Sequence, residues 1–287
     1  MKIGVSTYSF EKYVVQNKCD YFKLCDLAKE LGFEGIEFIH LDWQELSDNP
    51  MQTAGELREY CKKIGLEIIA YTVGANFLAD DVQAEMQKLK EHVDIAAALG
   101  APIMRHDVLY ELRDKPLYNY RTAIAEIAPL VRELTEYAQE KGVRTCSENH
   151  GFVMQDPRRV EELILAVGHE NYGWLCDMGN FLCADADPAA AVAIAARYAC
   201  HVHAKDFLFK AGTQPRPSGF TITTNAGNYL RGTVIGHGVV PIGNCVNALK
   251  KAGYDGWVSV EFEGAEENIQ ALKDGLENLR KIIRERE

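Results

Sequence analysis

Short runs rich in β-branched and aromatic residues alternate with longer segments of helical period along the whole chain. Repeated alternation of this kind is typical of strand–helix units arranged around a parallel sheet. We predict strands at residues 2–7, 35–39, 67–73, 102–106, 143–149, 173–177, 199–205 and 257–262. We predict helices near residues 21–31, 51–64, 80–99, 119–141, 156–167, 188–197, 241–252 and 266–285. The pattern predicts an α/β fold, the (β/α)8 TIM barrel.

One connection is much longer than the others. Residues 206–240 separate the seventh predicted strand from its helix and are rich in glycine, proline and threonine. Structureless loops of that length are usually lids or binding loops. We expect this loop to fold over the catalytic face and to contact the substrate through Arg231 or His237. The alternative is an exposed insertion without a function.

Composition and charge narrow the class of protein. The 287 residues contain no linker or composition break, so we expect one barrel domain over residues 1–287. The net charge of −11 opposes binding to nucleic acid or to an anionic membrane surface. Eight cysteines without a CxxC pair favour free thiols in the cytoplasm. We find neither the pattern of a signal peptide nor an apolar run that reaches the roughly 18 residues of a membrane span.

Four candidate metal ligands stand at the ends of the last four predicted strands, namely Glu148, Asp177, His203 and Glu261. In a parallel barrel the carboxyl ends of all strands open on one face, so these side chains can converge on one ion. Three carboxylates and one imidazole suit Mn²⁺, Mg²⁺, Co²⁺ or Zn²⁺, and the excess of carboxylates favours Mn²⁺ or Mg²⁺. Their charge of about −3 exceeds what a divalent ion neutralises, which favours a coordination position open to substrate. The alternative is a set of buried ion pairs that closes the barrel.

Other polar residues near strand ends are candidates for substrate contact. Glu37 ends the second predicted strand and suits either a substrate hydroxyl or a salt bridge to Arg105 or another barrel base. His106 is either a substrate contact or a hydrogen-bonded core histidine. His150 lies two residues after a predicted ligand and therefore on the same face, which favours substrate contact. Lys205 either positions the substrate or pairs with an acidic ligand.

Two aromatic residues, Tyr8 and Phe10, follow the first predicted strand and suit either stacking on a sugar or capping the core. The loop after the last strand reads EFEGAEEN, and its acidic residues would repel phosphate at the place where many barrels bind it. Arg216 or Arg231 of the long loop remains available as a phosphate clamp.

Five motifs along the chain carry a resemblance to a known family: GFEGIEF at 32–38, SENHG at 147–151, CDMGN at 176–180, HVHAKD at 201–206 and GYDGWVSVEFEG at 253–264. The chain resembles the sugar-phosphate isomerase/epimerase family of the xylose-isomerase-like barrel superfamily. The resemblance implies that Glu148, Asp177, His203 and Glu261 bind one divalent ion, with Glu148 and Glu261 acting also as the acid/base pair. In ketose epimerases a histidine that contacts substrate lies three residues after the aspartate, whereas this chain has Asn180 there, which we expect to contact substrate.

The leading hypothesis is a metal-dependent isomerase or epimerase that acts on a small ketose, keto-sugar or polyol through an enediolate. The alternative is a lyase that eliminates water or an aglycone from a keto-sugar, as inosose dehydratases do. An apurinic-site endonuclease of the same superfamily would need three zinc ions and more histidines than these strand ends supply, and a non-catalytic sugar-binding barrel is disfavoured by the complete ligand set. We expect a small carbohydrate as partner, Mn²⁺ as the favoured ion, and either a monomer or a homo-oligomer.

Overall fold

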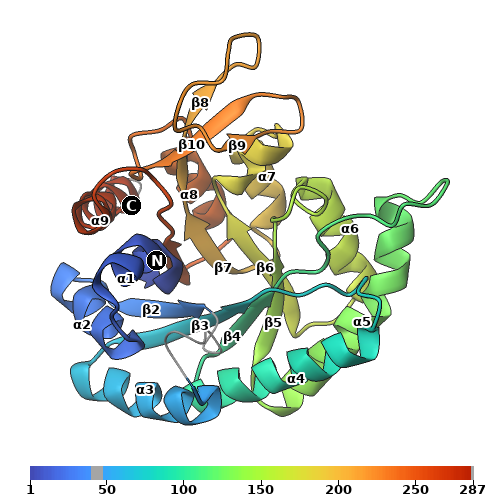
Figure 1. The fold of residues 1–287 in the computed structure, drawn as a ribbon, viewed down its shortest axis with the longest axis horizontal. Coiled ribbons are helices and arrows are strands. Elements are labelled where there is room, and N and C mark those ends of the chain that lie inside the picture. Colours follow the sequence, from blue (N-terminus) through green and yellow to red (C-terminus); the bar gives the residue numbers. More distant parts are fainter. Residues whose placement is uncertain (40–47, 286–287) are drawn as a thin grey trace.

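The barrel strands lie side by side in chain order and close on themselves (Figure 1). The computed structural model describes residues 1–39 and 48–285. The barrel consists of β1 (Lys2–Ser6), β2 (Gly35–Ile39), β3 (Glu67–Val73), β4 (Ile103–His106), β5 (Arg144–Glu148), β6 (Tyr172–Asp177), β7 (Ala199–Ala204) and β11 (Trp257–Val260). Strand β1 pairs in parallel with both β2 and β11, which closes the sheet. The predicted (β/α)8 barrel is therefore confirmed.

Helices surround the barrel between successive strands (Figure 1). The α-helices are α1 (Glu11–Asn17), α2 (Tyr21–Leu31), α3 (Pro50–Ile64), α4 (Val82–Leu99), α5 (Tyr120–Glu140), α6 (Pro157–Val167), α7 (Pro188–Ala195), α8 (Ile242–Lys251) and α9 (Asn268–Arg284). Two 3-10 helices, η1 (Thr7–Phe10) and η2 (Asn180–Ala184), directly follow β1 and the turn after β6. The sequence pattern predicted neither these short elements nor α1, because one or two turns are too short to show a period.

Apolar and polar residues occupy different parts of the barrel. Large apolar side chains fill the layer between strands and helices, as Leu24, Phe38 and Trp174 do. Inside the barrel, near the carboxyl ends of the strands, buried polar side chains gather instead. The register places Asp177 beside His203, and His203 beside Ser259, so the ends of β6, β7 and β11 lie at similar depth. The predicted ligands lie at this depth in the barrel.

The segment 206–240 is a folded unit with strands of its own, which the sequence pattern did not predict. It contains β8 (Asp206–Lys210), β9 (Ile222–Thr223) and β10 (Tyr229–Thr233), which form a three-stranded antiparallel sheet. The sheet lies beyond α7 and α8, drawn in orange in Figure 1. Alternating apolar residues build its inner face, where Phe207 and Leu230 pack with Cys183 of η2.

One set of hydrogen bonds joins the two ends of this segment, and another ties it to the loop after β11. Asp206 accepts hydrogen bonds from four backbone N–H groups, one of its neighbour and three from the far end of the segment, namely those of Phe207, Gly236, Gly238 and Val240. Gly238 is required at this close approach, because a Cβ there would lie 2.2 Å from Asp206 Oδ1. Thr233 Oγ1 donates to Glu266 Oε1 at 2.6 Å and ties β10 to the loop after β11.

In the described part of the chain, no helix combines the length and the apolar character that crossing a membrane requires.

Candidate metal centre

The structure brings the four predicted ligands together at one point. Glu148 and Asp177 end β5 and β6, His203 stands one residue before the end of β7, and Glu261 follows β11 directly. One donor atom of each residue lies within 4.8 Å of the other three. His203 Nδ1 is 3.3 Å from Glu261 Oε2 and 3.7 Å from both Glu148 Oε1 and Asp177 Oδ2. This is the convergence that parallel strand ends produce.

The atoms that face this point suit a cation. Asp177 Oδ2 and His203 Nδ1 are buried and make no hydrogen bond within the described chain. Such a group costs about 1–3 kcal/mol unless something else binds it. Apart from the Asp107–His150 pair and Asp206, which binds backbone N–H groups, the described chain buries four carboxylates and two cations, namely Glu37, Glu148, Asp177 and Glu261 against Arg105 and Lys205. One divalent ion would balance these charges, so the residues fit the expected metal.

The two buried cations hold two of the carboxylates. Arg105 Nη2 lies 2.6 Å from Glu148 Oε2, and Lys205 Nζ lies 2.6 Å from Glu261 Oε2 and 3.5 Å from Asp177 Oδ2. Burial opposes ionisation of both glutamates, but the adjacent cations outweigh it, so the pKa of Glu148 falls well below its usual range and that of Glu261 falls to about 2. Burial raises the pKa of Asp177 to about 7 against the charge of Lys205.

The two glutamates are bound unequally. Both oxygens of Glu148 are occupied, because Asn180 Nδ2 donates to Oε1 at 2.9 Å while Arg105 binds Oε2. Glu261 is contacted only at Oε2, by Lys205 and His203, and no contact in the described chain involves its Oε1. Asn180 also accepts from Lys205 Nζ at 3.3 Å, so the predicted substrate contact lies between a ligand and a cation, and is 4% exposed. Glu261 is therefore the carboxylate with a free oxygen.

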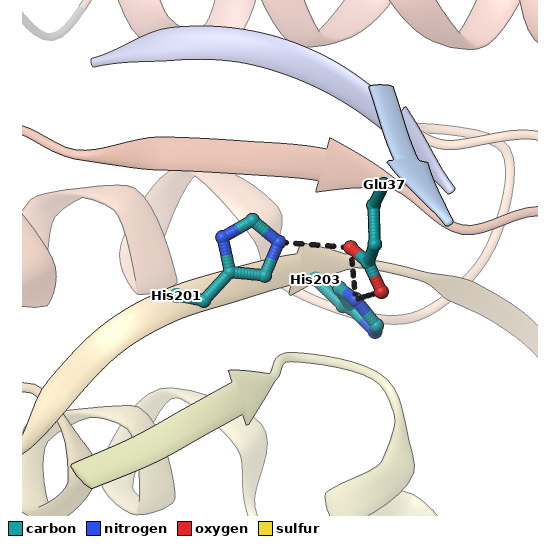
Figure 2. Close-up of side chains that lie close together, drawn as sticks. All are labelled: Glu37, His201 and His203. Carbon is teal, nitrogen blue, oxygen red and sulfur yellow. Dashed lines mark hydrogen bonds and ion pairs between the residues drawn. The ribbon is translucent and has the colours of Figure 1, made fainter. Parts of the chain in front are cut away.

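Glu37 lies beneath the four ligands and has no exposed surface. Figure 2 shows its carboxylate reaching from β2 to His201 and His203 of β7. His203 Nε2 is 3.0 and 2.9 Å from its two oxygens, and His201 Nε2 is 2.8 Å from Oε2. Thr72 Oγ1 donates to Oε1 at 2.7 Å. The expected contact with a substrate hydroxyl does not fit this enclosed position, and the bases that Glu37 pairs with are His201 and His203 instead of Arg105.

His106 and Phe10 belong to the core, in contrast to their expected contact with substrate. The strand period turns His106 away from the interior that its neighbour Arg105 enters. Its ring is fully buried between Phe77 and Tyr172, with centroids at 5.5 and 6.0 Å. Nδ1 bonds to the backbone oxygen of Asp107, and burial lowers the pKa of His106 to about 4, so the ring is neutral. The core alternative for this histidine is the one observed.

His150 and Tyr8 lie at the mouth of the site. The side chain of His150 is 45% exposed, and its Nδ1 is 2.8 Å from Asp107 Oδ1. Although burial opposes the charged imidazole, the hydrogen bond to Asp107 raises the pKa of His150. Tyr8 is partly buried, and burial together with the negative charge of Glu263 raises its pKa. Both side chains are placed where a bound ligand would meet solvent.

Arg231 and His237 lie apart from the ligands. Residues alternate across β10, so Arg231 is on the face opposite Leu230, and its guanidinium lies 5.9 Å from the ring centroid of Phe220. His237 is exposed in the turn after β10. Neither side chain forms a hydrogen bond or ion pair with the four ligands in the described ranges. Arg216 is used within the segment, where it donates to two backbone oxygens at 2.6 Å.

Sequence reasoning missed the site roles of Arg105, Asp107 and Asn149. Arg105 bridges Glu148 and Asp107, at 2.6 and 2.9 Å. Asn149 fastens β5 to β6, because its amide donates to the backbone oxygen of Asp177 and accepts from its N–H. The sequence did carry a signal for these three residues, since they also stand at or next to strand ends. A search of every strand end for charged and amide side chains would have found them.

Comparison with known proteins gives a matching family profile and several similar proteins. The family profile of the xylose isomerase-like TIM barrel matches residues 25–282. The rhizopine catabolism protein MocC of Rhizobium meliloti is 28% identical over 251 residues, which cover 81% of this chain and 74% of that protein. The inosose dehydratase of Geobacillus thermodenitrificans is 23% identical over 211 residues, which cover 69% of this chain and 70% of that protein.

Solved structures with a similar fold include enzymes of two reaction types. The IOLI protein with a bound zinc atom has a TM-score of 0.78 and 18% identity, covering 100% of this chain and 99% of that one. The probable 3-DHS dehydratase AsbF of Bacillus anthracis has a TM-score of 0.76 and 18% identity, with 98% and 99% covered. An L-ribulose 3-epimerase has a TM-score of 0.73 and 16% identity, with 100% and 96% covered.

Proposed function

Because the chain belongs to the xylose isomerase-like TIM barrel family, we propose that it is a divalent-metal-dependent lyase that removes water from a small polyhydroxylated ketone. Relatives and structural neighbours are named as dehydratases and as an epimerase. Both reactions begin when a base takes a proton from the carbon next to a carbonyl. The observation that favours the lyase is the unequal binding of the two glutamates.

Epimerisation by proton transfer needs one base on each face of the reacting carbon, because the proton leaves one face and returns to the other. Glu148 is a poor second base, since Asn180 and Arg105 occupy both of its oxygens. The contacts of Glu261 with Lys205 and His203 are both at Oε2, which leaves Oε1 without a donor among the described residues. One free carboxylate supports a one-base reaction, so the two-carboxylate mechanism expected from the sequence fits this site less well.

The proposed cycle uses Glu261 and Lys205. Glu261 Oε1 takes the proton next to the ketone, and the electron pair of that C–H bond forms the C=C bond as the neighbouring C–O bond breaks. The ammonium of Lys205 gives its proton to the departing hydroxyl, which leaves as water. The proton on Glu261 then returns to Lys205 across their 2.6 Å contact, which restores both groups. A bound divalent ion would supply positive charge next to the ketone oxygen and so raise the acidity of the adjacent carbon.

The chemistry of the mouth favours an uncharged substrate. Glu263 lies 3.8 Å from Lys205 and its side chain is 21% exposed, so a phosphate entering here would meet a carboxylate. An uncharged polyol ketone of the inosose class fits better.

For the ion, Mn²⁺ is favoured because three of the four ligands are carboxylates. All eight cysteines are free thiols, which supports a reducing compartment such as the cytoplasm.

The test is incubation of the Mn²⁺-loaded protein with inosose and related keto-polyols in D₂O, followed by mass detection. We expect a product lighter than the substrate by one water, and Glu261→Gln should lose about 10²-fold or more in rate. A product of unchanged mass apart from solvent deuterium would replace the lyase by an isomerase. Glu162→Gln, which alters an exposed ion pair with Arg121, is the control for a change of charge alone.

A further inference from the structure

We infer that Glu37 is a positioning residue that fixes the hydrogen of His203 on Nε2 and so aims Nδ1 at the metal. The inference rests on the proposed metal centre, although not on the reaction carried out there. Glu37 is not one of the four ligands, and its carboxylate lies on the opposite side of the His203 ring from them. Figure 2 shows this arrangement of Glu37 with the two histidines.

The geometry assigns the hydrogen. An ionised carboxylate only accepts hydrogen bonds, so a ring nitrogen at 2.9–3.0 Å from both oxygens of Glu37 must donate. His203 Nε2 therefore carries the hydrogen. The other ring nitrogen, Nδ1, makes no hydrogen bond and faces Glu148, Asp177 and Glu261 at 3.3–3.7 Å. A carboxylate that holds the far nitrogen of a ligating histidine fixes its orientation and strengthens it as a ligand.

Glu37 is itself fixed on two further sides. Thr72 Oγ1 donates to Oε1 at 2.7 Å, and His201 Nε2 donates to Oε2 at 2.8 Å. His201 Nε2 is also 3.0 Å from Ser259 Oγ. Glu37, His201 and His203 are all 0% exposed, so water cannot replace a lost contact from the solvent side. Because both oxygens of Glu37 already accept from O–H and N–H donors, the cluster is a support and not a second ion site.

The first experiment titrates the metal-free protein with Co²⁺ alone and follows the visible spectrum of the bound ion. Glu37→Gln keeps the size of the side chain but offers only one acceptor oxygen. We expect it to bind Co²⁺ about 10–100-fold more weakly than the wild type, with an altered spectrum. Glu37→Asp, which keeps the carboxylate, should recover part of the affinity. Wild-type affinity and spectrum in a folded Glu37→Gln protein would overturn the inference.

A matched control separates positioning from general loss of core stability. Thr135 and Thr145 form a buried hydroxyl pair at 2.8 Å between α5 and β5, away from the ligands. Thr135→Val should lower the thermal midpoint and leave Co²⁺ affinity unchanged. If Thr135→Val weakened Co²⁺ binding as much as Glu37→Gln does, the effect would be one of stability and the inference would fail. Two Co²⁺ ions per wild-type chain would also overturn it, because Glu37 would then be a ligand.

A second measurement needs no substitution at Glu37, so it decides the question even if that variant does not fold. In ¹⁵N-histidine-labelled wild type saturated with Zn²⁺, the metal-bound ring should show a protonated Nε2 and a metal-bound Nδ1. The reverse assignment would overturn the inference. Failure of the wild type to bind Co²⁺ would reject the metal centre and the proposed function together. Normal binding without any loss of water from substrate would reject the lyase and leave the role of Glu37 standing.

Discussion

His106 should make the protein sensitive to acid through its burial, without any part in turnover. Its Nδ1 donates to the backbone oxygen of Asp107 at 2.7 Å, and its Nε2 is buried without a hydrogen-bond partner in the described chain. Protonation would place a charge and an unsatisfied N–H group on Nε2, with Phe77 and Tyr172 against the ring. Burial thus explains why the pKa of His106 falls from 6.5 to about 4.

The direction of the change in stability with pH follows from the difference between the pKa values of the folded and unfolded states. Above pH 6.5 neither the folded nor the unfolded state protonates this ring, and the full stability is present. As the pH falls from 6.5 to about 4, the unfolded chain takes up a proton that the folded protein does not, so the free energy of unfolding decreases. At about 1.4 kcal/mol per pH unit, the total loss is about 3 kcal/mol.

His106→Phe removes the titrating group and keeps a ring against Phe77 and Tyr172. The lost hydrogen bond costs about 1 kcal/mol, and this cost, like any packing cost, does not depend on pH. Urea unfolding of both metal-free proteins between about pH 7.5 and pH 4 should show a stability difference that shifts by about 3 kcal/mol in favour of the variant. Parallel stability curves would refute the role of burial. Lost turnover in a stable variant would return His106 to the substrate site.

Three further predictions concern the site and its surroundings. Removal of the ion with a chelator should lower the thermal midpoint, because an ion at about 100 times its Kd adds about 2.7 kcal/mol, or roughly 5 °C, and calorimetry with re-added Mn²⁺ checks that the change reverses. Glu148→Gln should weaken Mn²⁺ binding as well as turnover, since it removes a ligand charge and leaves Arg105 with a weaker partner; equal affinity in a binding titration would contradict that. Limited proteolysis within 206–240 should proceed at the same rate with and without substrate, because Asp206 and Thr233 already fix the segment, and Arg231→Ala and His237→Ala should keep normal turnover. Protection by substrate would restore the lid expected from the sequence.

The barrel was predictable because each strand and helix carries its own periodic signal. Residues 35–39, 67–73 and 21–31 agree with β2, β3 and α2 at both ends. The convergence of the four ligands also followed from the strand ends, since parallel closure brings those ends to one face. The small sheet within 206–240 was not predictable in this way. Its strands are short, and its register depends on Asp206 binding backbone groups about 30 residues further along the chain.

The sequence also could not predict how deep a side chain lies in the barrel or which way it points. Glu37, in the middle of β2, and His106, at the end of β4, both have side chains suited to a substrate. Glu37 points inward but lies below the ligands, and His106 points outward to the helices. A shift of one residue in the register of a strand exchanges its two faces, so a register known only to within one residue cannot decide between core and site. Arg105 and His106 are an example. Substrate contact was expected of His106, but the side chain that enters the site is that of its neighbour Arg105.

Alternate residues of β7, β11 and the segments that directly follow them arrange the site in three layers. In the lowest layer His201 contacts Ser259 at 3.0 Å, and both are fully buried. In the middle layer His203 contacts Glu261 at 3.3 Å, and in the upper layer Lys205 lies 3.8 Å from Glu263. Because side chains alternate along a strand, every second residue faces the site. Along each of the two segments these residues are first a support, then a ligand and then a residue at the mouth of the site. Since Lys205 also touches Glu261, the proposed base stands where the ion and the substrate would meet.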